Sequence, residues 1–194
     1  MLRLSYKCSA GALVQVQVYL CRCRCTLQDK STIHYALSTR TRIKWAEIVF
    51  DQGLGHLFVI RVAGNIVSPS QVGSVEFAAS QFGTRLVVVL GHTQCGAILA
   101  TLDELQQPAE NQSRNLQSIV DRIRPSVEGL LKTELRHDLN TLVKHAVRAN
   151  VAASVNHLRH GSEILEELIL NDGLMVVGAE YSLETGVVEF FDGT

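Results

Sequence analysis

The feature that most constrains this chain is the apolar run from Leu86 to Leu90, which leads directly into the turn GHTQCGA at residues 91–97. The run is short, rich in valine and uninterrupted by polar residues, which is typical of a strand buried on both faces of a parallel sheet. Gly91 is expected to end the strand. His92 and Cys95 are therefore predicted at the carboxyl end of a central strand, where open α/β sheets place their ligands.

His92 and Cys95 are of the residue types that bind zinc. An imidazole nitrogen and a thiolate separated by one turn can reach the same ion, at about 2.0–2.1 Å and about 2.3 Å. The pattern alone is weak, because a buried structural cysteine beside a hydrogen-bonded histidine looks the same in a sequence. The sequence context of the turn favours the metal interpretation.

That context consists of two further stretches, AEIVFDQGLGHLFVIRVAGN at residues 46–65 and VGAEYSLETGVVEF at residues 177–190. In order and spacing, these stretches and the turn resemble the β-class carbonic anhydrases from about Ala46 to Phe191. The resemblance implies a zinc cofactor and the reversible hydration of carbon dioxide to bicarbonate. It also implies that His92 and Cys95 are zinc ligands, that Gly96 lies near the substrate, and that the protein is a homodimer or a larger even oligomer.

The segment just before Ala46 departs from the family pattern. In that family the first sheet strand ends in Cys-x-Asp-x-Arg, whose cysteine binds zinc and whose aspartate and arginine control access to the metal. The corresponding positions here are Thr39, Thr41 and Ile43. The arginines on either side of Thr41 are each one place out, and a slip of one residue turns a side chain to the opposite face of a strand. The sequence thus predicts an incomplete site with weak or substoichiometric zinc and no identifiable catalytic dyad.

Charge divides the chain at the same place. Residues 1–45 contain eight of the 18 basic residues and one of the 19 acidic residues, so the remainder of the chain is acidic. At 194 residues and 46% hydrophobic content the chain can bury one sizeable core. We therefore expect an atypical basic segment over residues 1–45 and a carbonic-anhydrase-like domain over residues 46–194.

The basic segment also holds four of the five cysteines, Cys8, Cys21, Cys23 and Cys25. The rest of the chain has a single cysteine, which is typical of a reducing compartment, so we expect a cytoplasmic protein. The alternation of cysteine and arginine over residues 21–25 differs from the two to four intervening residues of most zinc-binding pairs. Two other origins for the segment stay open, a cleaved targeting sequence and a shifted reading frame upstream of Ala46.

Hydrophobic periodicity predicts the remaining elements. We expect strands over residues 57–62, 86–90, 174–177 and 187–191, and helices over residues 70–82, 96–105, 115–124, 139–158 and 163–170. Pro125 is expected to end the third of these helices. Alternating strands and helices predict an α/β fold with a mainly parallel central sheet flanked by helices.

Composition argues against two classes of partner. The basic segment lacks the interleaved aromatic residues of a nucleic-acid surface, and its apolar stretch over residues 10–20 is too short to span a membrane. Three functional hypotheses follow: a carbonic anhydrase whose site is completed by another residue, a non-catalytic subunit or scaffold of the same fold, and the product of an altered reading frame. The residues favour an impaired site.

Overall fold

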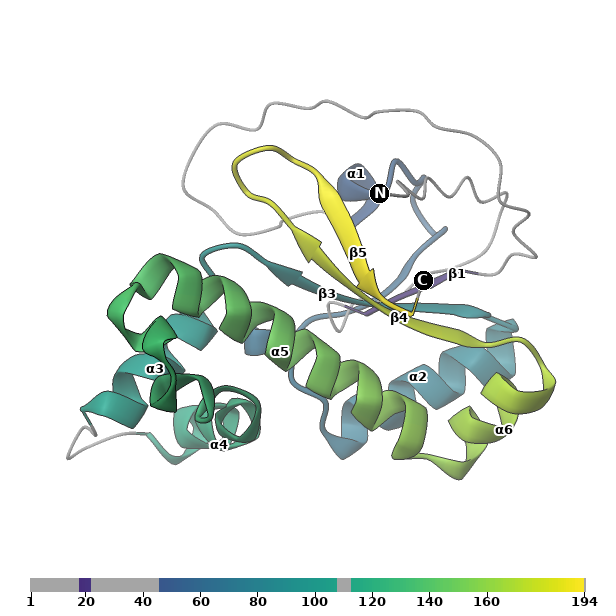
Figure 1. The fold of residues 1–194 in the computed structure, drawn as a ribbon. Helices are drawn as coiled ribbons and strands as arrows, with labels where there is room; N and C mark the ends of the chain where they lie inside the picture. The colour runs from purple at the N-terminus through teal and green to yellow at the C-terminus, as the bar shows by residue number, and fades with distance from the viewer. Residues whose placement is uncertain (1–17, 22–45, 108–112, 194) are drawn as a thin grey trace.

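The computed structural model describes residues 18–21, 46–107 and 113–193 (Figure 1). The described strands form a single sheet, and they are β1 Val18–Cys21, β2 Phe58–Ile60, β3 Leu86–His92, β4 Met175–Tyr181 and β5 Val188–Asp192. The described α-helices are α1 Ala46–Val49, α2 Pro69–Phe82, α3 Gly96–Gln106, α4 Arg114–Val127, α5 Leu139–His160 and α6 Glu163–Asn171. Short 3-10 helices are η1 Ala63–Asn65, η2 Leu130–Lys132 and η3 Glu134–His137.

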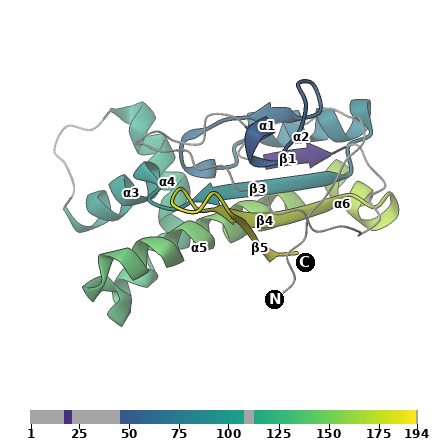
Figure 2. The ribbon, with the colours of Figure 1, turned by 90° about the horizontal axis from the view of Figure 1, so that it is seen from above.

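The strand order in the sheet is β2-β1-β3-β4-β5, and Figure 2 shows β1, β3 and β4 side by side. The predicted α/β fold is confirmed, with helices packed on a central sheet. Parallel pairing, however, is confined to β3 and β4 among the described strands, because β1 pairs in the antiparallel sense with both neighbours and β5 returns from β4 as a hairpin. Strands β2, β3 and β4 therefore share one direction, and the expectation of a mainly parallel sheet is corrected to this extent.

β3 is buried along its whole length, as the apolar run predicts. Its side chains alternate between two cores. Val87 and Val89 pack with residues of α2, α5 and α6 on the face that lies below the sheet in Figure 1. Leu86, Val88 and Leu90 pack on the other face, beside Ala46 of α1 and the β4–β5 hairpin. Because burying each such side chain contributes about 1.5–3 kcal/mol, this strand is a large contributor to the stability of the fold.

β3 does not end at Gly91, contrary to expectation, and continues to His92 in register with β4. Gly91 has a different structural role. A methyl group built on its Cα would lie 2.7 Å from Val151 Cγ2 and 2.9 Å from Val147 Cγ1, both on α5. Glycine is therefore required here because a helix crosses directly over the strand, and the close packing holds the last residues of β3 against α5.

Local signals set several helix ends. Ser68 and Gln71 form a capping box at the start of α2, and Gly83 ends that helix in the left-handed conformation, with φ of 64°. The Ser162 hydroxyl oxygen caps α6 by accepting the Leu165 N–H at 3.2 Å. The prediction that Pro125 ends a helix is wrong, since α4 continues to Val127. Val127 is fully buried, and this burial offsets the single backbone hydrogen bond that proline removes near the helix end.

None of the helices in the described ranges is both long and apolar enough to cross a membrane.

We predict that Gly91→Ala destabilises the protein by about 1–3 kcal/mol, because the added methyl group overlaps two valines of α5. Gly73→Ala is the matched control. Gly73 lies exposed within α2 with no neighbouring atom within 4 Å of the added carbon, so alanine there is expected to stabilise by about 0.5–1 kcal/mol. Urea denaturation followed by circular dichroism measures both. Equal stabilities for the two variants would contradict the proposed packing of β3 against α5.

Candidate metal centre

His92 and Cys95 lie at the junction of β3 and α3. His92 is the last residue of β3 and pairs with Tyr181 of β4, and Cys95 is the residue before the first turn of α3. Both side chains are buried, with 8% and 5% of their surface exposed. The prediction that the two residues lie together at the carboxyl end of a central strand is thus confirmed in the geometry of the chain.

The turn between them is held by the β4–β5 hairpin. The Thr93 backbone N–H donates to the Tyr181 carbonyl at 3.0 Å, and the Leu183 N–H donates to the Thr93 hydroxyl oxygen at 3.0 Å. The next residue, Gln94, has φ of 55°, a left-handed conformation that is uncommon outside glycine. This turn brings the chain from the strand into the helix within three residues.

A hydrogen bond orients the His92 ring. Its Nδ1 atom lies 2.9 Å from the Thr93 carbonyl oxygen. Because a carbonyl oxygen can only accept, Nδ1 of the neutral ring carries the proton and donates it. The lone pair of the neutral imidazole is then on Nε2, and this is the usual arrangement of a histidine whose second nitrogen binds a metal.

The Cys95 thiol lies in surroundings that favour its ionised form. Burial acts to raise its pKa, but a hydrogen bond to His92, the positive charge that the His92 ring carries when it is protonated, and the backbone N–H groups of Ile98 and Ala97 act in the opposite direction. The net effect is a pKa below the ordinary cysteine value. Since the thiolate is the metal-binding form of cysteine, the environment suits a soft cation such as zinc.

The donors present match zinc in type but make up half of a tetrahedral set. Among the residues that the structure describes, no third histidine, cysteine, aspartate or glutamate joins His92 and Cys95 in a group that could hold a metal ion. Thr39, Thr41 and Ile43, at the family's ligand and dyad positions, lie outside the described residues. The absence of the third ligand and of the dyad therefore stays a prediction from the sequence.

The backbone register of β1 bears on whether Cys21 could supply the missing donor. Cys21 pairs with Leu86, the first residue of β3, whereas His92 is the last. Six residues of extended strand separate the two positions by about 20 Å. Cys21 therefore lies at the wrong end of the sheet to share a zinc ion with His92, while Cys23 and Cys25 lie outside the described residues.

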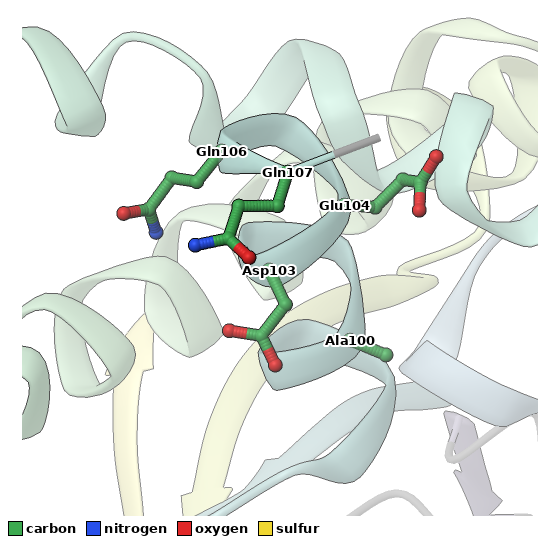
Figure 3. A pocket seen from close by; sticks show the side chains of 5 residues that line it. All are labelled: Ala100, Asp103, Glu104, Gln106 and Gln107. Carbon is green, nitrogen blue, oxygen red and sulfur yellow. The ribbon is translucent and has the colours of Figure 1, made fainter. Parts of the chain in front are cut away.

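Gly96 opens α3 beside the donor pair. No other atom lies within 4 Å of the position that a Cβ would take, so there is open space at this backbone. Its expected role near the substrate stays a prediction. A separate surface pocket lies farther along α3, as Figure 3 shows, and it is lined by Ala100, Asp103, Glu104, Gln106 and Gln107. Neither His92 nor Cys95 lines that pocket.

The sequence did not predict two networks of polar side chains on α5. Asn150 of α5 donates to the Gly64 carbonyl at 2.7 Å, and Ser154 donates to the Asn65 carbonyl at 2.8 Å, which fixes the turn after β2. Asn150 and Ser154 are spaced by one helical turn on the buried face of α5, and a polar pair at that spacing is the available signal.

The second network joins α5 to the hairpin. Arg148 donates to Glu180 at 2.7 Å and to Glu189 at 2.5 Å, and its guanidinium lies 5.0 Å from the centre of the Phe191 ring. Glu180 is almost fully buried. A glutamate at the end of an apolar strand was the signal for a buried ion pair.

Comparison with known proteins identifies the family of this chain. The family model described as carbonic anhydrase matches residues 40–188. The chain belongs to the β-class carbonic anhydrase family. The matched range begins slightly before Ala46 and includes the positions of Thr41 and Ile43. The resemblance predicted from the turn and its flanking stretches is confirmed.

Relatives and solved structures agree with this assignment. Carbonic anhydrase 2 of Mycobacterium tuberculosis is 36% identical over 141 residues, which are 73% of this chain and 65% of that protein. Carbonic anhydrase of Mycolicibacterium smegmatis is 36% identical over 144 residues, covering 74% of this chain and 67% of that protein. The chain therefore spans about two thirds of the length of these relatives.

The fold is shared with solved β-carbonic anhydrases. The enzyme CafA of Aspergillus fumigatus superposes with a TM-score of 0.67 at 24% identity, covering 77% of this chain and 70% of that one. The β-carbonic anhydrase CcaA gives a TM-score of 0.65 at 23% identity, with 77% and 74% coverage. The α/β fold predicted for this chain is thus that of the β-class carbonic anhydrases.

We predict that Cys95→Ser abolishes any zinc binding by this chain, because it removes one of two donors, and that Cys21→Ser leaves zinc content unchanged. Elemental analysis of both variants after dialysis measures the difference. Loss of zinc from the Cys21 variant alone would contradict the register of β1 against β3.

Proposed function

We propose that this chain is a β-class carbonic anhydrase with an incomplete zinc site, which hydrates carbon dioxide to bicarbonate slowly. The observation that carries the proposal is the buried pair His92 and Cys95 at the carboxyl end of β3, without a third donor among the described residues. Family membership supports the reaction, and the residues at positions 39, 41 and 43 support its impairment.

The chain's own residues have separate parts in this proposal. His92 through Nε2 and Cys95 through its sulfur would hold the zinc ion. When bound, zinc supplies the Lewis acidity that makes hydroxide available near neutral pH. Thr41 and Ile43 cannot replace an ionised aspartate and arginine, because neither side chain carries a charge, so the groups that would orient the attacking hydroxide are absent.

The second candidate is a non-catalytic subunit or scaffold of the same fold. The shortage of donors favours it, because two protein ligands are expected to bind zinc weakly. Either candidate could form a homodimer or a larger even oligomer. Support for this comes from two β-carbonic anhydrases of Sordaria macrospora, which share the fold and are tetrameric. A shifted reading frame upstream of Ala46 would account for both candidates.

The first test compares the purified chain with the carbonic anhydrase of Mycolicibacterium smegmatis. We predict zinc well below one ion per chain after dialysis, because an incomplete ligand set forfeits much of the free energy of a closed site. We predict carbon dioxide hydration slower than that of the relative by roughly 100-fold or more, since both a charged ligand and the orienting groups are lost. Elemental analysis and stopped-flow measurements give the two values.

Each result separates the candidates. Slow hydration that His92→Ala abolishes supports the impaired enzyme. No hydration above that of the His92→Ala variant supports the non-catalytic subunit. One tightly held zinc per chain together with a rate equal to that of the relative would overturn both.

We further predict that the triple variant Thr39→Cys, Thr41→Asp and Ile43→Arg gains zinc and hydration activity. The three positions alternate along the chain, so on a strand their side chains share one face. They must change together, because a buried aspartate without its arginine is an unpaired charge. Zinc analysis and stopped-flow rates are the measurements, with the two-residue variant Thr41→Asp and Ile43→Arg as control.

A failure of the triple variant to gain zinc or activity would test the assignment of residues 39–43. A triple variant that folds but gains neither zinc nor activity would show that residues 39–43 do not form the family's first strand. Exchange of residues 1–45 for the N-terminal segment of the Mycolicibacterium relative is then expected to succeed.

A further inference from the structure

We infer that Thr93 is a positioning residue through which the β4–β5 hairpin holds His92 and Cys95 in one geometry. The inference rests on the proposed function, because it concerns the donor pair of that site. Thr93 itself contributes no metal ligand. It lies between the two donors in the chain and is half-buried.

Thr93 is bound to the hairpin by both its backbone and its side chain. Its N–H donates to the Tyr181 carbonyl at 3.0 Å, which extends the β3–β4 pairing by one hydrogen bond beyond His92. Its hydroxyl oxygen accepts the Leu183 N–H at 3.0 Å. These two hydrogen bonds, which we call the Thr93 latch, hold the Thr93 residue at its backbone N–H and at its side chain.

Thr93 also supplies the hydrogen-bond partner of the His92 ring. The Thr93 carbonyl oxygen lies 2.9 Å from Nδ1 and accepts its proton. The direction of this carbonyl therefore sets the angle of the imidazole and keeps the proton on Nδ1. A hydrogen bond at one ring nitrogen decides which nitrogen remains for the metal, and outer partners of this kind contribute strongly to metal affinity.

The backbone conformation of Gln94 is a second feature of the turn that needs contacts with the hairpin to hold it. Its positive φ costs on the order of 1 kcal/mol or more and persists only where surrounding contacts hold it. The Gln94 side-chain amide donates to Glu184 of the same hairpin at 3.3 Å. The turn is thus held at two consecutive residues by one loop, and Cys95 follows directly.

The hairpin is itself a rigid support. Arg148 of α5 binds Glu180 on β4 and Glu189 on β5, which pair directly with each other across the two strands. The Thr93 latch therefore connects the donor pair to α5 through one charged contact network. Functional groups held by rigid elements keep their geometry better than groups held by loops alone.

The test compares three variants. Thr93→Val keeps the shape of the side chain but removes the acceptor of the Leu183 N–H. Thr93→Ser restores a hydroxyl. Ser182→Ala is the matched control, because Ser182 accepts the Thr185 N–H at 3.1 Å within the same hairpin and its side chain has no hydrogen bond to residues 92–95 among those described. All three are made in the full chain.

The probe is cobalt(II), followed by its thiolate charge-transfer absorption, with Cys95→Ser as the background for the other cysteines. We expect Thr93→Val to weaken cobalt binding by about 10-fold or more, because the carbonyl that partners the His92 ring is then held less firmly, while Thr93→Ser and Ser182→Ala stay within about twofold of the parent chain. Equal affinity for Thr93→Val and the parent chain would overturn the inference, whatever the effect on unfolding. A loss of affinity as large in Ser182→Ala would show that hairpin stability alone is responsible, and would overturn it as well.

A metal-free measurement separates this inference from the proposed function. Nitrogen-15 shifts of the His92 ring report the position of its proton. At a pH at which the ring is neutral, we expect a single Nδ1-protonated form in the parent chain and Thr93→Ser, and a mixture of the two tautomers in Thr93→Val. An unchanged tautomer in Thr93→Val would overturn the Thr93 latch. Tight, stoichiometric metal binding by the parent chain would instead overturn the proposed incomplete site and leave the comparison of variants intact.

Discussion

Burial of β3 on both faces is the constraint on which the rest of the structure depends. The side chains of this strand alternate between two cores, and the absence of a side chain at Gly91 lets α5 cross directly over its last residues. A strand placed this way has no freedom to shift by one residue, because a shift would exchange the two faces. The position of everything that follows the strand, beginning with His92, is therefore set by packing that lies away from the site.

The candidate metal centre combines this rigid strand with a turn of unusual conformation. The pKa of Cys95 is lowered despite burial, because His92 and the first backbone N–H groups of α3 favour the thiolate. The hairpin between β4 and β5 contacts the turn from the side, and Arg148 connects that hairpin to α5. The two donor side chains are thus held in place and have the chemistry that a metal ion requires, although two donors alone do not complete a tetrahedral site.

The differences between prediction and structure have physical causes in tertiary packing. The sequence predicts that Pro125 ends its helix. In the structure the burial of Val127 favours continuation of α4 past Pro125 to Val127. The sequence also predicts that Gly91 ends its strand, but this glycine permits a close approach of α5 instead. The roles of Asn150 and Arg148 were missed, because their partners lie far away in the sequence and no local pattern connects a helix residue to a turn or a strand that it will contact.

The sequence by itself determined the β3 strand, the proximity of His92 and Cys95 and the family, because these depend on residue type and spacing over short distances. It also predicted that a ligand is missing, since Thr39, Thr41 and Ile43 occupy the family's ligand and dyad positions. Only the tertiary structure decided the direction of β1, the distance of Cys21 from the donors and the hydrogen bonds that orient His92. Strand direction and register follow from backbone hydrogen bonds between distant segments, and residue type carries little information about those pairings.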